Sequence, residues 1–98
     1  MNHTRLTVRA IRVTIASTTT EAVTLPLGTE YFTIAEEGGA GDIRWAATSS
    51  ADAAGDLASH RVSAGATSPV IGADPTTLWL NAPAGEAKAY IFIVCAGT

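Results

Sequence analysis

The last third of the chain, residues 76–95, constrains the fold more than any other part. It predicts a β-hairpin whose turn holds Pro83 and whose long strand runs from about Ala87 to Cys95. Because side chains alternate along a strand, the apolar residues of this long strand fall on both of its faces. A strand that is apolar on both faces needs cover on both, which predicts a sandwich, a barrel or an interface with another protein.

Alternating apolar residues predict short strands along the rest of the chain as well. They fall over residues 5–16, 22–27, 30–36, 42–48, 61–63 and 69–71 and in the two arms of 76–95. About seven short strands separated by turns predict an all-β fold, a small antiparallel β-sandwich or jelly-roll-like domain. We expect residues 1–98 to form this single domain, with residues 1–4 flexible and a long loop at about 49–61 that holds at most one helical turn.

The first predicted strand, residues 5–16, changes its apolar parity halfway along. The apolar residues are even-numbered at first and odd-numbered afterwards: Leu6, Val8 and Ala10, then Ile11, Val13 and Ile15. A flip of this kind is expected from a β-bulge or a bend, so we expect one bent strand or two short ones.

Two further expectations concern strand pairing and position. Residues 30–36 and 42–48 flank a glycine-rich turn, which predicts a second hairpin. In the strand over residues 22–27 we expect Val23, Leu25 and Leu27 to point inward. Pro26 cannot donate a ladder hydrogen bond, so this strand is expected at a sheet edge.

Charge is sparse and unevenly distributed. Charged residues make up 15% of the chain and the net charge is −3, so the chain lacks the basic excess of a nucleic-acid binder. Its positive charge gathers at the start, where Arg5, Arg9 and Arg12 stand among the first twenty residues without an acid. These arginines could dock on an acidic partner surface, or they could simply solvate one strand face.

Cys95 is the single cysteine, and it stands among apolar residues as a small core side chain would. One cysteine excludes a disulfide within the chain and a cysteine-based zinc site. The N-terminal residues lack the apolar run of a signal peptide, and the stretch from Ala89 to Ala96 is too short to span a bilayer. We therefore expect that the protein does not associate with a membrane and that it is assembled in the cytosol.

Residues capable of chemistry do not form a known motif. His60 lies near Asp52 and Asp56, but their spacing lacks the alternating oxygens of a calcium loop. There is no Gly-x-Ser-x-Gly elbow for a nucleophile, and the glycines of 38–41 are not followed by the lysine of a phosphate-binding loop. We expect no enzyme activity, no cofactor and no metal.

Trp79 is the strongest aromatic candidate for a partner contact. It alternates out of phase with Leu78 and Leu80, so one side of its strand shows Trp79 and Asn81. Tryptophans often anchor interfaces, although this one could also be a core residue that covers a second sheet. An exposed Trp79 or Trp45 beside the acidic 49–60 loop could instead bind a sugar.

Four segments of the chain are together similar to small β-sandwich structural proteins of tailed bacteriophages. They are Tyr31–Ile34, Gly41–Ser49, Val62–Gly65 and Thr77–Ile93. In these phage proteins a strand that ends in small polar residues precedes a loop, an Ala-Gly turn and an L-W/Y-x-x-A-x-x-G-x-A hairpin. The resemblance covers roughly residues 28–95 and implies a capsid decoration (cement) protein or a head–tail or tail accessory, with no catalytic residue to carry over.

These inferences together predict a non-enzymatic virion structural protein. It would self-associate and stabilise a phage capsid by binding the major capsid protein, after assembly in the bacterial host cytoplasm. The interface candidates are Arg5, Arg9, Arg12, Trp79 and Asn81. The alternatives are a carbohydrate-binding module, or a tail or host-attachment accessory, that uses Trp79 and Trp45.

Overall fold

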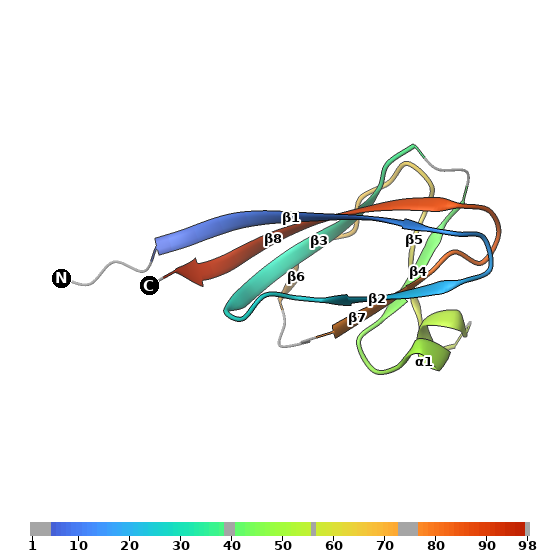
Figure 1. Cartoon of the computed structure of the whole chain (residues 1–98), viewed down its shortest axis with the longest axis horizontal. Helices are drawn as coiled ribbons and strands as arrows, with labels where there is room; N and C mark the ends of the chain where they lie inside the picture. The colour runs from blue at the N-terminus through green and yellow to red at the C-terminus, as the bar shows by residue number, and fades with distance from the viewer. Residues whose placement is uncertain (1–4, 39–40, 56, 73–76, 98) are drawn as a thin grey trace.

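Two four-stranded antiparallel sheets pack face to face in the computed structural model, which describes residues 5–38, 41–55, 57–72 and 77–97 (Figure 1). Sheet A has the strand order β1-β8-β3-β6, and sheet B has the order β2-β7-β4-β5. The predicted all-β sandwich is confirmed, and the strand order is that of a jelly roll. The prediction that residues 1–4 are flexible lies outside the described residues.

The elements have the following bounds. Sheet A contains β1 (Arg5–Ile15), β8 (Ala87–Gly97), β3 (Thr29–Glu36) and β6 (Ile71–Gly72). Sheet B contains β2 (Thr20–Thr24), β7 (Thr77–Asn81), β4 (Ile43–Ala46) and β5 (His60–Val62). A short helix, α1 (Ser50–Ala54), follows β4 and packs against β2, β4 and β7. The predicted loop at about 49–61 was expected to hold at most one helical turn, and α1 is that turn.

The core lies between the two sheets and is built by the alternating residues of each strand. From sheet A it takes Ile15, Phe32, Ile34, Ala87, Ala89, Ile91, Ile93 and Cys95. From sheet B and its connections it takes Val23, Leu25, Ile43, Trp45, Val62, Leu78, Leu80 and Ala82. Leu27, which was expected to point inward, is exposed because β2 ends before it and residues 27–28 form a turn.

Both predicted hairpins are wrong. β3 lies in sheet A and β4 in sheet B, and β7 and β8 are likewise divided between the sheets. Among the described strands, β4 and β5 form the one pair of successive strands that share a ladder. The chain therefore passes from one sheet to the other between β3 and β4 and between β7 and β8, and the two strands of each pair bury their apolar faces from opposite sides of the same core.

The two crossing connections pack against each other at one end of the sandwich. Gly41 is buried there, and a Cβ atom at this position would lie 2.5 Å from the backbone oxygen of Ala84. Gly41 is therefore required for close backbone approach. The sequence suggested a glycine-rich turn for its flexibility, whereas packing is the reason for this particular glycine.

The predicted bulge in the first strand is also wrong. β1 pairs with β8 in an unbroken register from Arg5–Gly97 to Ile15–Ala87. The parity flip has another cause: Ile11, Val13 and Ile15 face the core, whereas the apolar residues before them face outward. A register shift does occur in sheet A, but it lies in β3 between Thr29 and Tyr31.

A buried carboxylate fastens the end of β3. Glu36 is 2% exposed, and its two carboxylate oxygens accept hydrogen bonds from the backbone N–H groups of Gly65 (3.0 Å) and Lys88 (2.9 Å). Hydrogen bonds to a charged acceptor are stronger than neutral ones. Glu36 thus ties β3 to the connection after β5 and to the start of β8.

Candidate interaction surface

The outward side of sheet A carries large apolar side chains at the end nearest the chain termini. Since residues paired across antiparallel strands share a face, the pairs Leu6–Ala96, Val8–Val94 and Ala10–Phe92 all lie on it. β3 adds Tyr31, which pairs with Val94. We call this surface, made of Leu6, Val8, Ala10, Tyr31, Phe92, Val94 and Ala96, the outer apolar face.

Several side chains of the outer apolar face are open to solvent. Val8 is 61% exposed and Leu6 56%, and the rings of Tyr31 and Phe92 are 37% and 36% exposed. Val94, in the middle, is buried by its neighbours. Contiguous exposed apolar surface of this kind marks interaction sites in soluble proteins, whereas single exposed apolar residues are ordinary.

The free edge of sheet A borders this face. β1 is eleven residues long and stands at the end of the strand order, so within the described residues its outer edge pairs with no strand. Figure 1 shows the β1–β8 pair running toward the termini beyond the described ends of β2 and β7. A long free edge offers backbone N–H and C=O groups to a further strand.

On the outward side of sheet A, charged residues follow the outer apolar face toward the C-terminal end of β1. The Arg12 guanidinium lies 4.5 Å from the centre of the Tyr90 ring and 3.9 Å from a carboxylate oxygen of Glu37. Arg12 also lines an open depression of about 150 Å³ with Glu37 and Lys88. That volume is below the roughly 300 Å³ of a typical ligand pocket, so this depression does not fit a drug-sized ligand.

The three arginines do not gather on one face. Arg12 lies on the outward side of sheet A, whereas Arg9 pairs with Ile93 and therefore lies on the opposite side. Arg9 is exposed there because it lies beyond the part of β1 that packs on the core, which begins at Ile11. Arg5 belongs to β1, but its side chain lies outside the described part.

The two tryptophans lie on opposite sides of sheet B. Trp45 is in the core, stacked on His60 with ring centres 4.5 Å apart and edge-on to Phe32. Trp79 pairs with Ala46 and Ala22 on the outward side and is half-buried. The sheet separates the two rings, so they cannot form one sugar-binding platform.

Asn81 has an internal role. It is 6% exposed, and its side-chain amide donates hydrogen bonds of 2.9 Å to the Thr19 carbonyl and to Thr20 Oγ1. These bonds hold the turn between β1 and β2 against β7. Asn81 is therefore not available for contact with a partner.

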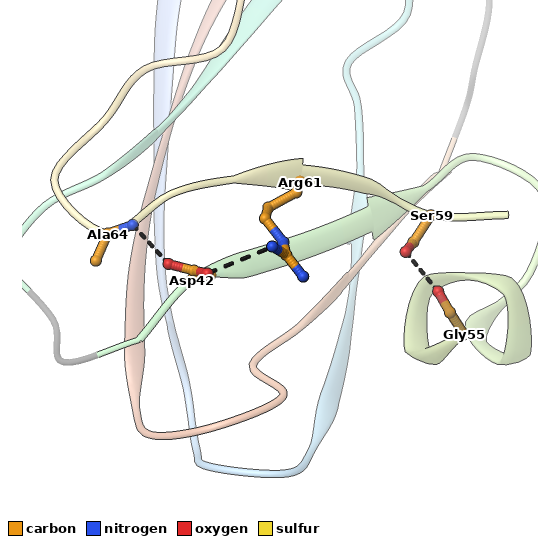
Figure 2. Close-up of polar contacts among 5 residues, drawn as sticks. All are labelled: Asp42, Gly55, Ser59, Arg61 and Ala64. Atoms are coloured by element: carbon orange, nitrogen blue, oxygen red, sulfur yellow. Dashed lines mark hydrogen bonds and ion pairs between the residues drawn. The ribbon is translucent and has the colours of Figure 1, made fainter. Parts of the chain in front are cut away.

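Two acids of the β4–α1–β5 region, Asp42 and Asp52, are likewise used within the fold, whereas Asp56 lies outside the described residues. Figure 2 shows Asp42 accepting a hydrogen bond from the Ala64 N–H (2.9 Å) and lying 3.9 Å from Arg61, while Ser59 donates to the Gly55 carbonyl. Asp52 accepts a hydrogen bond from Thr48 and, through its N–H, donates to the N-cap Ser49. These contacts fasten β5 and α1 in place.

Three further observations bear on function. Cys95 is buried, with its sulfur 4.0 Å from Thr29 Oγ1. Within the described ranges, no three His, Cys, Asp or Glu side chains come together as a metal site would require. Across those same residues, no helix has both the length and the apolar character needed to cross a membrane.

The sequence did not identify the outer apolar face as a candidate site. The signal is the parity flip of residues 5–16, which predicts a β-bulge or a bend. With an unbroken register, the same flip means that the first apolar residues of β1 lie outside the core. The two-sided apolar pattern of β8 is a second signal, since an interface with another protein was one of the three arrangements that it predicts.

Comparison with known proteins adds a structural neighbour. No protein-family model matches the chain, and a search of curated proteins also finds no match. A solved structure described as "Bacillus endospore appendages form a novel family of disulfide-linked pili" is similar over 99% of this chain and 93% of that one, with a TM-score of 0.55 and 10% identity. At that identity the likeness establishes a shared fold: the chain is an all-β sandwich of the same general architecture as this pilus protein.

Proposed function

We propose that this protein is a non-enzymatic structural subunit that associates with copies of itself and is built into a larger extracellular or virion assembly. The outer apolar face beside the free β1 edge carries the proposal. Apolar side chains such as Val8, at 61% exposure, cost free energy when left in water. Cover by a partner removes that cost.

The residues that could otherwise have served chemistry support a structural role. Asp42 and Asp52 are hydrogen-bonded within the fold, His60 stacks on Trp45, and Cys95 is buried. Each has a packing or hydrogen-bonding role that accounts for its presence. A subunit of an assembly needs rigidity of this kind more than it needs an open cleft.

The structural neighbour supports self-association. Its description names pili, which are assemblies of many subunits, and its chain has the same sandwich architecture. The description also names disulfide links, and in this respect the two proteins differ. The single cysteine here, Cys95, is 3% exposed, so we propose that the contacts between copies of this chain are non-covalent.

The particular assembly that we propose is the phage virion, with the major capsid protein as the larger partner. This part rests on the resemblance of residues 28–95 to phage β-sandwich proteins. Weak contacts that repeat on a lattice gain avidity of about 10²–10⁴, so a small oligomer with a modest affinity per copy would suffice. Placement in the tail is the alternative within the same class.

Sedimentation equilibrium across a wide concentration range tests the proposal. We expect the weight-average mass to rise from that of the 10.0 kDa monomer as concentration increases. A mass that stays monomeric up to millimolar concentration contradicts self-association. Co-sedimentation with purified phage capsids or tails then tests the virion: binding to either supports it, and binding to neither contradicts this part while the self-association result stands.

A further inference from the structure

Strand β1 can pair with a copy of itself across a two-fold axis. We infer that a second copy of this chain docks edge to edge on residues 5–11 of β1, antiparallel, with Val8 opposite Val8. The two A sheets then form one continuous sheet whose outer apolar faces join. This inference rests on the proposed self-association and names the surface that performs it.

The edge of β1 lacks most devices that prevent such pairing. Soluble proteins protect edge strands with short length, proline, bulges or inward-pointing charges. β1 has eleven residues, no proline and an unbroken register with β8. The segment 5–11 has two charged residues, Arg5 and Arg9, and Arg9, on the core side of sheet A, is the one inward-pointing charge among its described side chains.

The sequence of β1 selects the register. In an antiparallel pair of identical strands the axis passes through one residue, and each side chain faces a partner on the same side of the sheet. Axes at Thr7, Arg9 or Arg12 place two arginines directly opposite each other, which is destabilising. These registers are therefore disfavoured.

Of the remaining axes, Val8 keeps the outward side apolar. It places Val8 on Val8 and Leu6 on Ala10, while on the other side of the sheet Arg9 faces Thr7 and Arg5 is opposite Ile11. An axis at Ala10 or Ile11 instead sets Arg12 against Val8 or Ala10 on the outward side, so a charge interrupts the apolar surface there. Self-complementarity of this kind favours a second copy over an unrelated protein, because a two-fold contact uses the same patch twice.

Cysteine crosslinking tests the register directly. In a Cys95→Ala background, Val8→Cys places two thiols on the axis with Cβ atoms about 5 Å apart, and we expect rapid disulfide-linked dimers under mild oxidation. Thr14→Cys, on the same face of the same strand, is the matched control. Its two copies would lie about 40 Å apart, so we expect no crosslink.

A mixing experiment distinguishes neighbouring registers. Leu6→Cys and Ala10→Cys should each stay uncrosslinked alone and should crosslink when mixed, because Leu6 faces Ala10. Crosslinking of either variant by itself identifies a different axis and overturns the proposed register. Failure of Val8→Cys to crosslink, in a variant that remains folded by circular dichroism, overturns it as well.

Measuring dimer dissociation distinguishes a wrong β1 surface from a failure of the proposed self-association. The variant L6S/V8S should weaken the dimer by about 10-fold, because the apolar cross-strand pairs Val8–Val8 and Leu6–Ala10 are lost at the edge-to-edge contact. Phe32 and the rest of the core are untouched, so its thermal unfolding should match the parent. If the parent associates and L6S/V8S associates equally well, self-association stands and the β1 surface is refuted; a monomeric parent refutes both.

Discussion

The outward faces of the two sheets differ in how far the chain itself covers them. On the side where α1 packs, sheet B carries Ala46, which is 2% exposed, the half-buried Trp79 and the exposed Ala22. Sheet A carries Leu6, Val8 and Phe92 on its outward side, and all three are exposed. Figure 1 shows α1 outside sheet B, on the far side of the sandwich from sheet A.

A helix of the chain itself covers part of sheet B. α1 packs against β2, β4 and β7, and its Ala53 is fully buried. The helix is short, so its stability depends on this packing and on its N-cap. Sheet A has large apolar side chains and no described element over them. The chain therefore covers part of one outer face with its own helix, whereas we propose that a partner covers the other.

The largest expected effect compares two phenylalanines of sheet A. Phe32 is 1% exposed in the core, whereas Phe92 is 36% exposed on the outer apolar face. Phe32→Ala should lower the free energy of unfolding by about 3–5 kcal/mol. Phe92→Ala should cost the isolated monomer less than about 1 kcal/mol. Urea unfolding of dilute protein measures both, and equal losses would show that the outward face is not open.

The next effect concerns the carboxylate that fastens β3. Glu36→Ala leaves the N–H groups of Gly65 and Lys88 without their acceptors, which should cost about 2–3 kcal/mol. Glu36→Gln retains one side-chain oxygen, so we expect an intermediate loss in the same urea titration. Glu37→Ala is the matched control: its carboxylate is half-exposed in a 3.9 Å ion pair and should contribute less than about 1 kcal/mol. An equal loss for Glu36→Ala and Glu37→Ala would contradict the buried role.

A smaller effect is expected from a change at the N-cap of α1, the helix that covers part of sheet B. Ser49 accepts a hydrogen bond from the Asp52 N–H as the N-cap of α1. Ser49→Ala should cost about 1 kcal/mol and loosen the helix. If α1 shields the half-buried Trp79, acrylamide should quench that ring more strongly in the variant. Repeating the measurement in Trp79→Phe leaves only Trp45, and any remaining change there would mean that the core was disturbed instead.

The smallest expected change in stability is at Val8. Val8→Thr keeps the shape and β-propensity of the side chain at a 61% exposed position, so the free energy of unfolding should change by no more than about 0.5 kcal/mol. Self-association should nevertheless weaken, because a hydroxyl replaces a methyl group at the proposed axis. A large loss of monomer stability would mean that Val8 is packed within its own chain.

The sequence by itself determined most of the strands and which of their residues share a face. Alternation predicts that Phe32 and Ile34, and likewise Leu78 and Leu80, share one side of a strand, and the structure places each of these pairs together in the core. The all-β class followed from the number of such strands. This success has a local cause, since side-chain alternation is a property of one strand and needs no knowledge of its neighbours.

Pairing and exposure were decided only by the tertiary structure. β7 and β8 are close in sequence and looked like a hairpin, yet each pairs with strands distant along the chain. The parity flip in β1 looked like a bulge, yet it records where the core ends and the outer apolar face begins. Alternation states which residues share a side of a strand, but which side is buried depends on the layer packed against it, and that layer comes from elsewhere in the chain.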